Sequence, residues 1–180
     1  NMKIPEIDVA QINLRCGITL FASQDKAIDK VLNDLVEKIP AQLILLTDIS
    51  GQIVSVCGER GKANLVAMGS LVAGDLAASQ EMARISGGYQ DYQLVLREGT
   101  TRNTWIVEAG PYLVMLLQVS TEVPMGWVRL LIRKSAQVIA GIITASPEEI
   151  SNEFEATNSL GLGDNFAEQV NDALDELWSE

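Results

Sequence analysis

The longest periodic run of apolar residues in the sequence extends from Ala63 to Ser86. On a helical wheel its bulky side chains gather on one side, which predicts a single long helix packed on a core. The residues expected in that core are Leu65, Met68, Leu71, Val72, Leu76 and Met82. The opposite side of the helix carries small residues, where a helix on a protein surface usually carries charged ones.

Two rows of small residues make up that opposite side: Gly69, Ala73 and Ala77, and Ser70, Gly74 and Ala78. Small side chains let another backbone come close, and a glycine inside a helix costs about 1 kcal/mol relative to alanine. We therefore favour a contact surface for a second helix, most simply that of a second copy of the chain. The alternative is a surface of small residues under a loop. The predicted dimer interface consists of Ser70, Ala73, Gly74, Ala77, Ala78 and Glu81.

The pattern on either side of the long helix predicts an α+β domain. We expect a helix, two strands, the long helix, three strands and a last helix, over residues 24–38, 43–46, 52–57, 63–86, 92–98, 103–108, 112–119 and 124–145. The first two strands form a hairpin and the last three a meander. The prediction is therefore a five-stranded antiparallel sheet, with the long helix on one face and the other two helices on the opposite face.

A further strand is expected ahead of the first helix. Residues 11–22 alternate as a half-buried strand does, and their apolar face carries Ile12, Leu14, Cys16, Ile18 and Leu20. We expect this strand to extend an edge of the sheet, and Ser23 or Asp25 to cap the helix that follows. The chain thus divides into an N-terminal extension (1–22), a main domain (23–145) and a tail (146–180).

Composition excludes several kinds of catalytic site. The sequence has no histidine, which rules out Ser-His-Asp and Cys-His nucleophile systems and every His-ligated metal site. Cys16 and Cys57 form no disulfide pattern, and the start of the sequence lacks the apolar region of a signal peptide. We therefore expect a cytoplasmic protein.

No stretch of the sequence carries a strong signature of nucleotide chemistry. The segment Gly58–Ala63 is only faintly similar to a phosphate-binding loop, because its two glycines are too close together and Ala63 replaces the Ser or Thr that would hold Mg²⁺. Arginine fingers assist some phosphoryl-transfer reactions, but nothing singles out one of Arg60, Arg84, Arg97 and Arg102. We expect no metal and no cofactor, and a binding module rather than an enzyme.

Charge is unevenly distributed along the chain. Residues 146–180 contain ten acidic residues and no basic one, whereas residues 1–145 contain fourteen acidic and thirteen basic residues. The acidic tail argues against nucleic acid and against an anionic membrane as partners. Arg129, Arg133 and Lys134 form a basic group on the last helix, which we interpret as a solvated surface, with contact to an anion or an acidic partner as the alternative.

The tail predicts two short helices joined by a linker. Ser146–Glu149 is a capping box with proline at the first helical position, and Asp164 caps the second helix. The second helix has an apolar ridge at helical spacing, made of Phe166, Val170, Leu174, Leu177 and Trp178. We predict that this ridge binds a groove of a partner. The alternative, to which we give equal weight, is that the helix packs on its own domain.

The element order and three stretches of the sequence resemble the Roadblock/dynein light chain family, in particular its bacterial MglB-type members. The three stretches are Leu43–Gly51 (LILLTDISG), Ser70–Arg84 (SLVAGDLAASQEMAR) and Met125–Lys134 (MGWVRLLIRK). The strand Gly17–Ala22 is also similar, so the resemblance covers about residues 17–145.

The resemblance implies a homodimer, with adjacent long helices and with the third strands of the two copies paired across the two-fold axis. It also implies that this dimer binds a Ras-like GTPase of the MglA type and stimulates GTP hydrolysis. Because the GTPase in that system supplies its own catalytic groups, no catalytic residue is assigned to this chain. The alternative is a Roadblock-type scaffold that binds a GTPase or another protein without altering catalysis.

Overall fold

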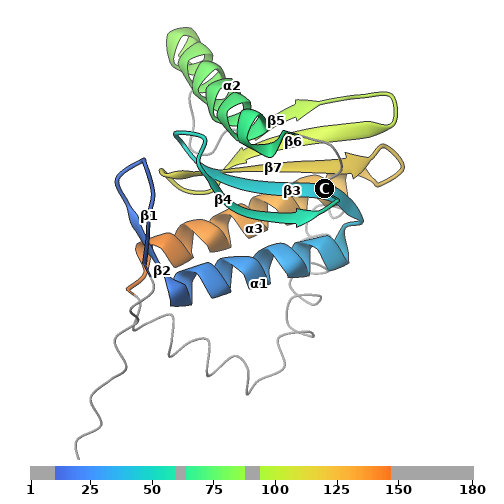
Figure 1. Cartoon of the computed structure of the whole chain (residues 1–180). Coiled ribbons are helices and arrows are strands. Elements are labelled where there is room, and N and C mark those ends of the chain that lie inside the picture. The colour runs from blue at the N-terminus through green and yellow to red at the C-terminus, as the bar shows by residue number, and fades with distance from the viewer. Residues whose placement is uncertain (1–10, 60–63, 88–93, 147–180) are drawn as a thin grey trace, which may run out of the picture. The chain divides into compact units, whose positions relative to one another are not determined.

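Two layers of helices enclose a five-stranded sheet in the computed structural model of the chain (Figure 1). The structure describes residues 11–59, 64–87 and 94–146. The chain divides after Ala145 into two units, and the sheet and its helices belong to the first. In chain order the elements are β1 (Gln11–Asn13), β2 (Thr19–Phe21), α1 (Ala22–Lys38), β3 (Ala41–Asp48), β4 (Ile53–Gly58), α2 (Leu65–Ser86), β5 (Leu94–Arg97), β6 (Arg102–Glu108), β7 (Leu113–Ser120) and α3 (Met125–Thr144).

The sheet confirms the predicted α+β architecture. Its strand order is β4-β3-β7-β6-β5, and every neighbouring pair is antiparallel. α2 crosses one face, whereas α1 and α3 lie side by side on the other (Figure 1). β3 and β7 are central and nearly completely buried, as expected of strands that are covered on both faces.

The core beneath α2 is a single cluster of aliphatic side chains. It contains Leu43, Leu45, Val72, Leu76, Ile106, Val114 and Leu116, with Leu65 and Met68 packed at its margin. Neighbouring residues along a strand point to opposite faces. Ile44, Leu46 and Met115, which are also fully buried, therefore face the layer of α1 and α3.

The predicted N-terminal strand forms, but its expected place at the edge of the main sheet is wrong. Residues 11–21 form a hairpin in which β1 pairs with β2, and this two-stranded sheet is separate from the main one. The chain reverses at Gly17, whose φ of 96° suits glycine, and a hydrogen bond from the Gly17 amide to the Leu14 carbonyl closes the turn. The alternation of apolar and polar residues therefore continues across a turn and does not mark a single strand. Ile12 is 45% exposed although Leu14 and Leu20 are buried.

The first helix starts in a different way from the one predicted, because neither Ser23 nor Asp25 caps it. α1 begins at Ala22, and the side-chain oxygen of Gln24 accepts a hydrogen bond of 3.0 Å from the amide of Phe21. The Gln24 amide nitrogen donates to the carbonyls of Ile142 (3.1 Å) and Ala145 (3.3 Å). Buried Gln24 thus joins the first turn of α1 to the last turn of α3 and satisfies carbonyls that the helix end leaves unpaired.

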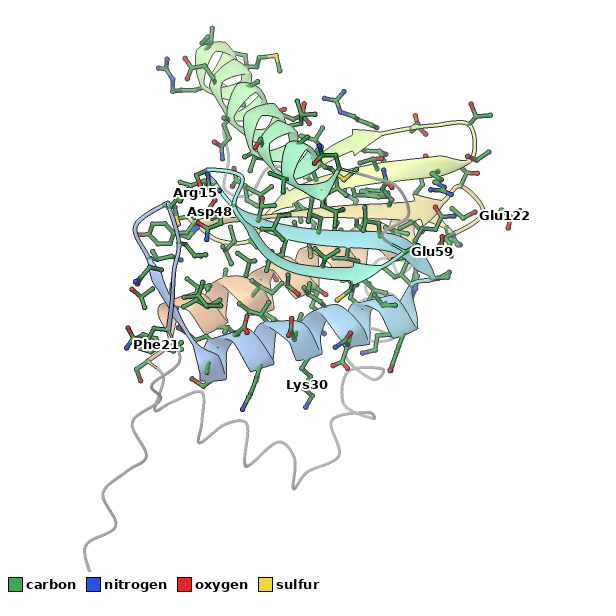
Figure 2. All side chains as sticks on the ribbon, in the orientation of Figure 1. Arg15, Phe21, Lys30, Asp48, Glu59 and Glu122 are labelled. Atoms are coloured by element: carbon green, nitrogen blue, oxygen red, sulfur yellow. The ribbon has the colours of Figure 1, made fainter. Side chains whose placement is uncertain are left out.

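A buried carboxylate, Asp48, connects the hairpin to the main sheet. Its Oδ1 accepts hydrogen bonds from the amides of Ser50 (2.9 Å) and Gln52 (2.8 Å) and from the Ser50 hydroxyl (2.6 Å). Its Oδ2 accepts one from the amide of Cys16 (3.1 Å). Figure 2 shows Arg15 and Asp48 close together where the hairpin tip meets the β3–β4 turn, and the Arg15 amide donates to the Gln52 side chain there.

The hydrogen bonds determine the charge state of Asp48. Burial acts to raise its pKa, but the hydrogen bonds from Ser50, Gln52 and Cys16 outweigh burial, so the pKa lies below its ordinary value of 3.8. The folded state therefore holds the carboxylate ionised. The stabilisation is fully present above pH 3.8 and is lost as the pH falls through the lowered pKa of the folded protein.

The β3–β4 turn also touches α2 at a contact between two glycines. A Cβ atom at Gly69 would lie 2.7 Å from the carbonyl oxygen of Gly51, and a Cβ at Gly51 would lie 2.6 Å from the Cα of Ser70. Real Cβ atoms do not come that close to backbone atoms, so this approach requires glycine at both positions. The side of α2 that carries Gly69 therefore faces the sheet.

We expect Asp48→Ala to lower the free energy of unfolding by about 3 kcal/mol, because three backbone amides lose a charged acceptor in a buried site. Urea unfolding at neutral pH measures this loss, and Glu122→Ala in an exposed turn serves as the control. The difference between wild type and Asp48→Ala should shrink as the pH falls below 3.8. Equal stability of the two variants at neutral pH would contradict the role of Asp48.

We expect Gly69→Ala to lower the free energy of unfolding by about 1–3 kcal/mol, because the new methyl group overlaps the Gly51 carbonyl. The matched control is Gly141→Ala, an exposed position in α3 where an added Cβ meets nothing within 4 Å. That substitution should leave stability unchanged or raise it by up to about 1 kcal/mol. The contact is disproved if both variants unfold at the same urea concentration.

Candidate interaction surface on the long helix

α2 is a continuous helix that begins and ends with defined caps. The Asn64 side chain accepts a hydrogen bond of 3.1 Å from the amide of Ala67 at its start. At its end Gly87 adopts a left-handed conformation with φ of 72°, which is typical of a helix terminus. The predicted long helix over 63–86 is thus confirmed from Leu65 onward, and position 63 lies outside the described residues.

Only part of the predicted core side of α2 faces the sheet. Val72 and Leu76 are buried, as expected. Leu71 and Met82 were also expected in the core, but they are 73% and 64% exposed. Gly69, which was expected on the outer side, is buried against the β3–β4 turn. The helix is therefore rotated toward its smaller residues, because only a glycine fits where α2 meets Gly51.

Most of the predicted interface residues lie on the outer side of α2. The exposed ones are Ser70, Gly74, Ala77, Ala78 and Glu81. Ala73 differs from the others, because it is only 8% exposed and lies on the side of the helix that faces the sheet. Nothing lies within 4 Å of a Cβ built at Gly74, so the middle of the outer surface is a shallow strip of small side chains.

The outer side also exposes large apolar residues that the sequence pattern assigned elsewhere or left out. They are Val66 (67%), Leu71 (73%), Met82 (64%) and Ile85 (74%). Large side chains thus stand near both ends of α2, with small ones between them. We call Ala67, Ser70, Leu71, Gly74, Ala78, Glu81, Met82 and Ile85 the outer stripe; they recur at spacings of three and four, as in helix-to-helix contacts.

The charged residues near the outer stripe are paired within the helix. Arg84 donates two hydrogen bonds to Glu81, at 2.6 and 2.8 Å. This exposed pair lowers the pKa of Glu81 and raises the pKa of Arg84, so both groups stay ionised near neutral pH. The pair carries no net charge and therefore does little to oppose a second apolar surface.

Two polar contacts attach the inner side of α2 to the far strands of the sheet. Asp75 forms an ion pair with Arg97 of β5, and Gln80 donates a hydrogen bond to Glu108, a nearly buried residue of β6. The sequence pattern did not single out these residues as a set. Together with the Gly51–Gly69 contact, they fix the rotation of α2 and so decide which residues it presents to solvent.

The described ranges contain no group of three or more acidic, cysteine or histidine side chains that could bind a metal ion. None of the described helices is both long and apolar enough to span a bilayer.

The structure places three of the four arginines considered as possible arginine fingers. Arg84 and Arg97 are engaged in ion pairs, and Arg102 is exposed at the start of β6. The structure does not describe Arg60 or the tail ridge of Phe166, Val170, Leu174, Leu177 and Trp178.

Solved structures of known proteins share this fold. No protein-family model and no curated protein matches the chain. A structure of MglB with a tetrameric arrangement matches with a TM-score of 0.63 and 24% identity, over 73% of this chain and 95% of that one. MglB of Myxococcus xanthus matches with a TM-score of 0.60 and 25% identity, over 64% of this chain and 93% of that one.

A Roadblock/LC7 domain from Streptomyces avermitilis is similar in fold, with a TM-score of 0.58 and 16% identity over 65% of this chain and 98% of that one. The MglB structures exceed it in both TM-score and identity. The resemblance seen in three stretches of the sequence therefore extends to the three-dimensional fold. The chain has the Roadblock/LC7 fold in an MglB-like form.

Proposed function

We propose that this protein is a cytoplasmic homodimer that regulates a Ras-like GTPase of the MglA type. In this proposal the dimer binds the GTPase, remodels its active site and stimulates GTP hydrolysis, and it contributes no catalytic group of its own. The observation that carries the proposal is the exposed apolar outer stripe of α2 in an MglB-like fold. Exposed apolar strips of this kind mark protein–protein contact sites.

The outer stripe suits an antiparallel partner of the same sequence. A two-fold axis perpendicular to α2, passing midway between Gly74 and Ala78, places Ala67 of one copy opposite Ile85 of the other. The same axis places Ser70 opposite Met82. Large residues would thus meet small ones near the ends, and small residues would meet at the centre, where the two backbones come closest. Burying a large aliphatic side chain contributes about 1.5–3 kcal/mol.

The sheet offers a second element to the same dimer. β5 is a strand of four residues at one edge of the main sheet. An edge strand has backbone groups available for pairing with another chain. In the proposed dimer the β5 strands pair across the axis, and the Asp75–Arg97 ion pair couples that pairing to the position of α2.

The ion pairs of two arginines support regulation without a catalytic group from this chain. Arg84 and Arg97, which lie near the proposed dimer contact, already pair with Glu81 and Asp75. An arginine finger must instead be free to contact the transferred phosphoryl group.

The tail ridge enters the proposal as a further contact to the GTPase, made by Phe166, Val170, Leu174, Leu177 and Trp178. The surrounding carboxylates would speed association.

The dimer predicts that Leu71→Glu combined with Ile85→Glu produces a monomer, because two charges per copy would be buried in the contact. Both residues are more than 70% exposed in the chain, so the fold itself should tolerate the change. Sedimentation equilibrium measures the oligomeric state. The control is Val138→Glu on α3, an exposed apolar residue in the opposite layer. A wild type that stays monomeric at high concentration would overturn the dimer.

Regulation predicts that the cognate GTPase hydrolyses GTP faster with this protein than without it. GTP turnover measures this directly, with the Leu71→Glu and Ile85→Glu double variant as a dimer-deficient comparison. Binding without faster turnover would replace the proposal by the scaffold alternative.

The proposed role of the tail ridge predicts that a chain ending at Ser159 binds the GTPase more weakly at an unchanged melting temperature. A lower melting temperature of the truncated chain would argue against a tail ridge reserved for the GTPase.

A further inference from the structure

The outer side of α3 carries a row of exposed side chains that includes two arginines. Met125, Arg129, Arg133 and Gln137 follow one another at intervals of four residues, and all four are exposed. We call them the α3 row. This surface belongs to the layer of α1 and α3, opposite to α2 (Figure 1), so it is independent of the proposed dimer contact.

The two arginines of the α3 row differ from those near α2. Arg84 and Arg97 each pair with a carboxylate. Within residues 11–59, 64–87 and 94–146, the side chains of Arg129 and Arg133 form no hydrogen bond and no ion pair. α3 has three basic residues and no acidic one, so this helix carries a net positive charge.

The third basic residue, Lys134, belongs to a different surface. It is half-buried and lies near Lys38 of α1. Burial of the Lys38 ammonium group lowers the pKa of that residue, and the positive charge of Lys134 lowers it further. Lys38 also lies near Asp34 and Glu37 of α1. Lys134 thus lies toward α1, whereas the α3 row is exposed to solvent within the described part of the chain.

We propose that the α3 row binds an acidic helical segment of another protein. Arg129 and Arg133 lie one helical turn apart, which matches two carboxylates spaced by four residues on a facing helix. Guanidinium groups bind carboxylates through two parallel hydrogen bonds. Met125, which is 45% exposed at the start of the row, offers an apolar contact beside the two ion pairs.

The charge around the row favours a narrow acidic partner over an extended anionic surface. Binding to anionic lipid usually needs a cluster of about four to eight basic residues, and the row has two. α1 lies beside α3 in the same layer and carries charges of both signs, the carboxylates of Asp25, Asp29, Asp34 and Glu37 and the amines of Lys26, Lys30 and Lys38. An anionic surface that covers the whole layer would meet this mixture, whereas a single helix along α3 meets the two arginines of the row.

Titration of the full chain with a stapled helical peptide tests the proposal. The peptide carries Glu pairs at i and i+4 and a neighbouring row of Leu, and its analogue has Gln in place of every Glu. We expect the Glu peptide to bind more tightly than the Gln analogue and to weaken with added salt. Arg129→Gln combined with Arg133→Gln should weaken binding about tenfold, the loss of two exposed ion pairs.

The control removes two positive charges elsewhere, by Lys26→Gln combined with Arg102→Gln, both at exposed positions, and should bind the peptide as wild type does. Three results would overturn the proposal: no binding of the Glu peptide, equal binding of both peptides, or equal weakening in the control. Phosphatidylserine vesicles provide the last comparison. Binding to the vesicles in preference to the peptide would also overturn it, because the surface would then recognise lipid.

Discussion

The rest of the structure depends on how closely the backbone of α2 approaches the β3–β4 turn. Gly69 and Gly51 touch where any side chain would collide with backbone, so α2 has one rotation in which it can lie on the sheet. That rotation buries Val72 and Leu76 over the central strands. It also turns Leu71, Met82 and Ile85 toward solvent, which leaves the long helix apolar on both sides.

The β3–β4 turn is itself held in place by Asp48. Its carboxylate organises the turn through Ser50 and Gln52 and attaches the N-terminal hairpin through Cys16. The same few residues therefore connect three parts of the fold: the hairpin, the sheet and α2. A surface that must bind partners in a defined geometry benefits from such a support, because hydrogen bonds to a buried charge are stronger than those between neutral groups.

The layers of the fold divide its proposed contacts between opposite sides. α2 and the edge strand β5 provide an apolar surface whose charges are paired, which suits a permanent contact with a second copy. α3 provides two exposed arginines, which have no ion-pair partner in the described part of the chain and suit a partner chosen by charge. A regulator of this design could hold its dimer and its acidic partner at the same time, because neither contact covers the other.

The sequence pattern was sufficient for the architecture, since long periodic helices and short strand connections leave few arrangements of an α+β sheet. It was insufficient for the rotation of α2. Apolar residues occupy most sides of that helix, and the helical wheel placed the large ones, Leu71 and Met82, in the expected core. The side that packs is decided by the Gly51 contact, which lies 18 residues away from Gly69 in the sequence. A similar non-local bond, from Gln24 to the end of α3, decided the start of α1, and the turn at Gly17 divided a continuous alternation into a hairpin.

In the proposed dimer the outward side of α2 associates with a second copy. Methionine methyl groups can report on it directly, because Met82 lies in the outer stripe at 64% exposure and Met125 lies on α3 at 45%. A dilution series of the full chain, labelled with ¹³C in its methionine methyl groups and followed by NMR, compares the two environments. We expect the Met82 resonance to shift with concentration while the Met125 resonance stays constant. A Met82 resonance that is independent of concentration in a protein that sediments as a dimer would contradict it, because the dimer would then use another surface.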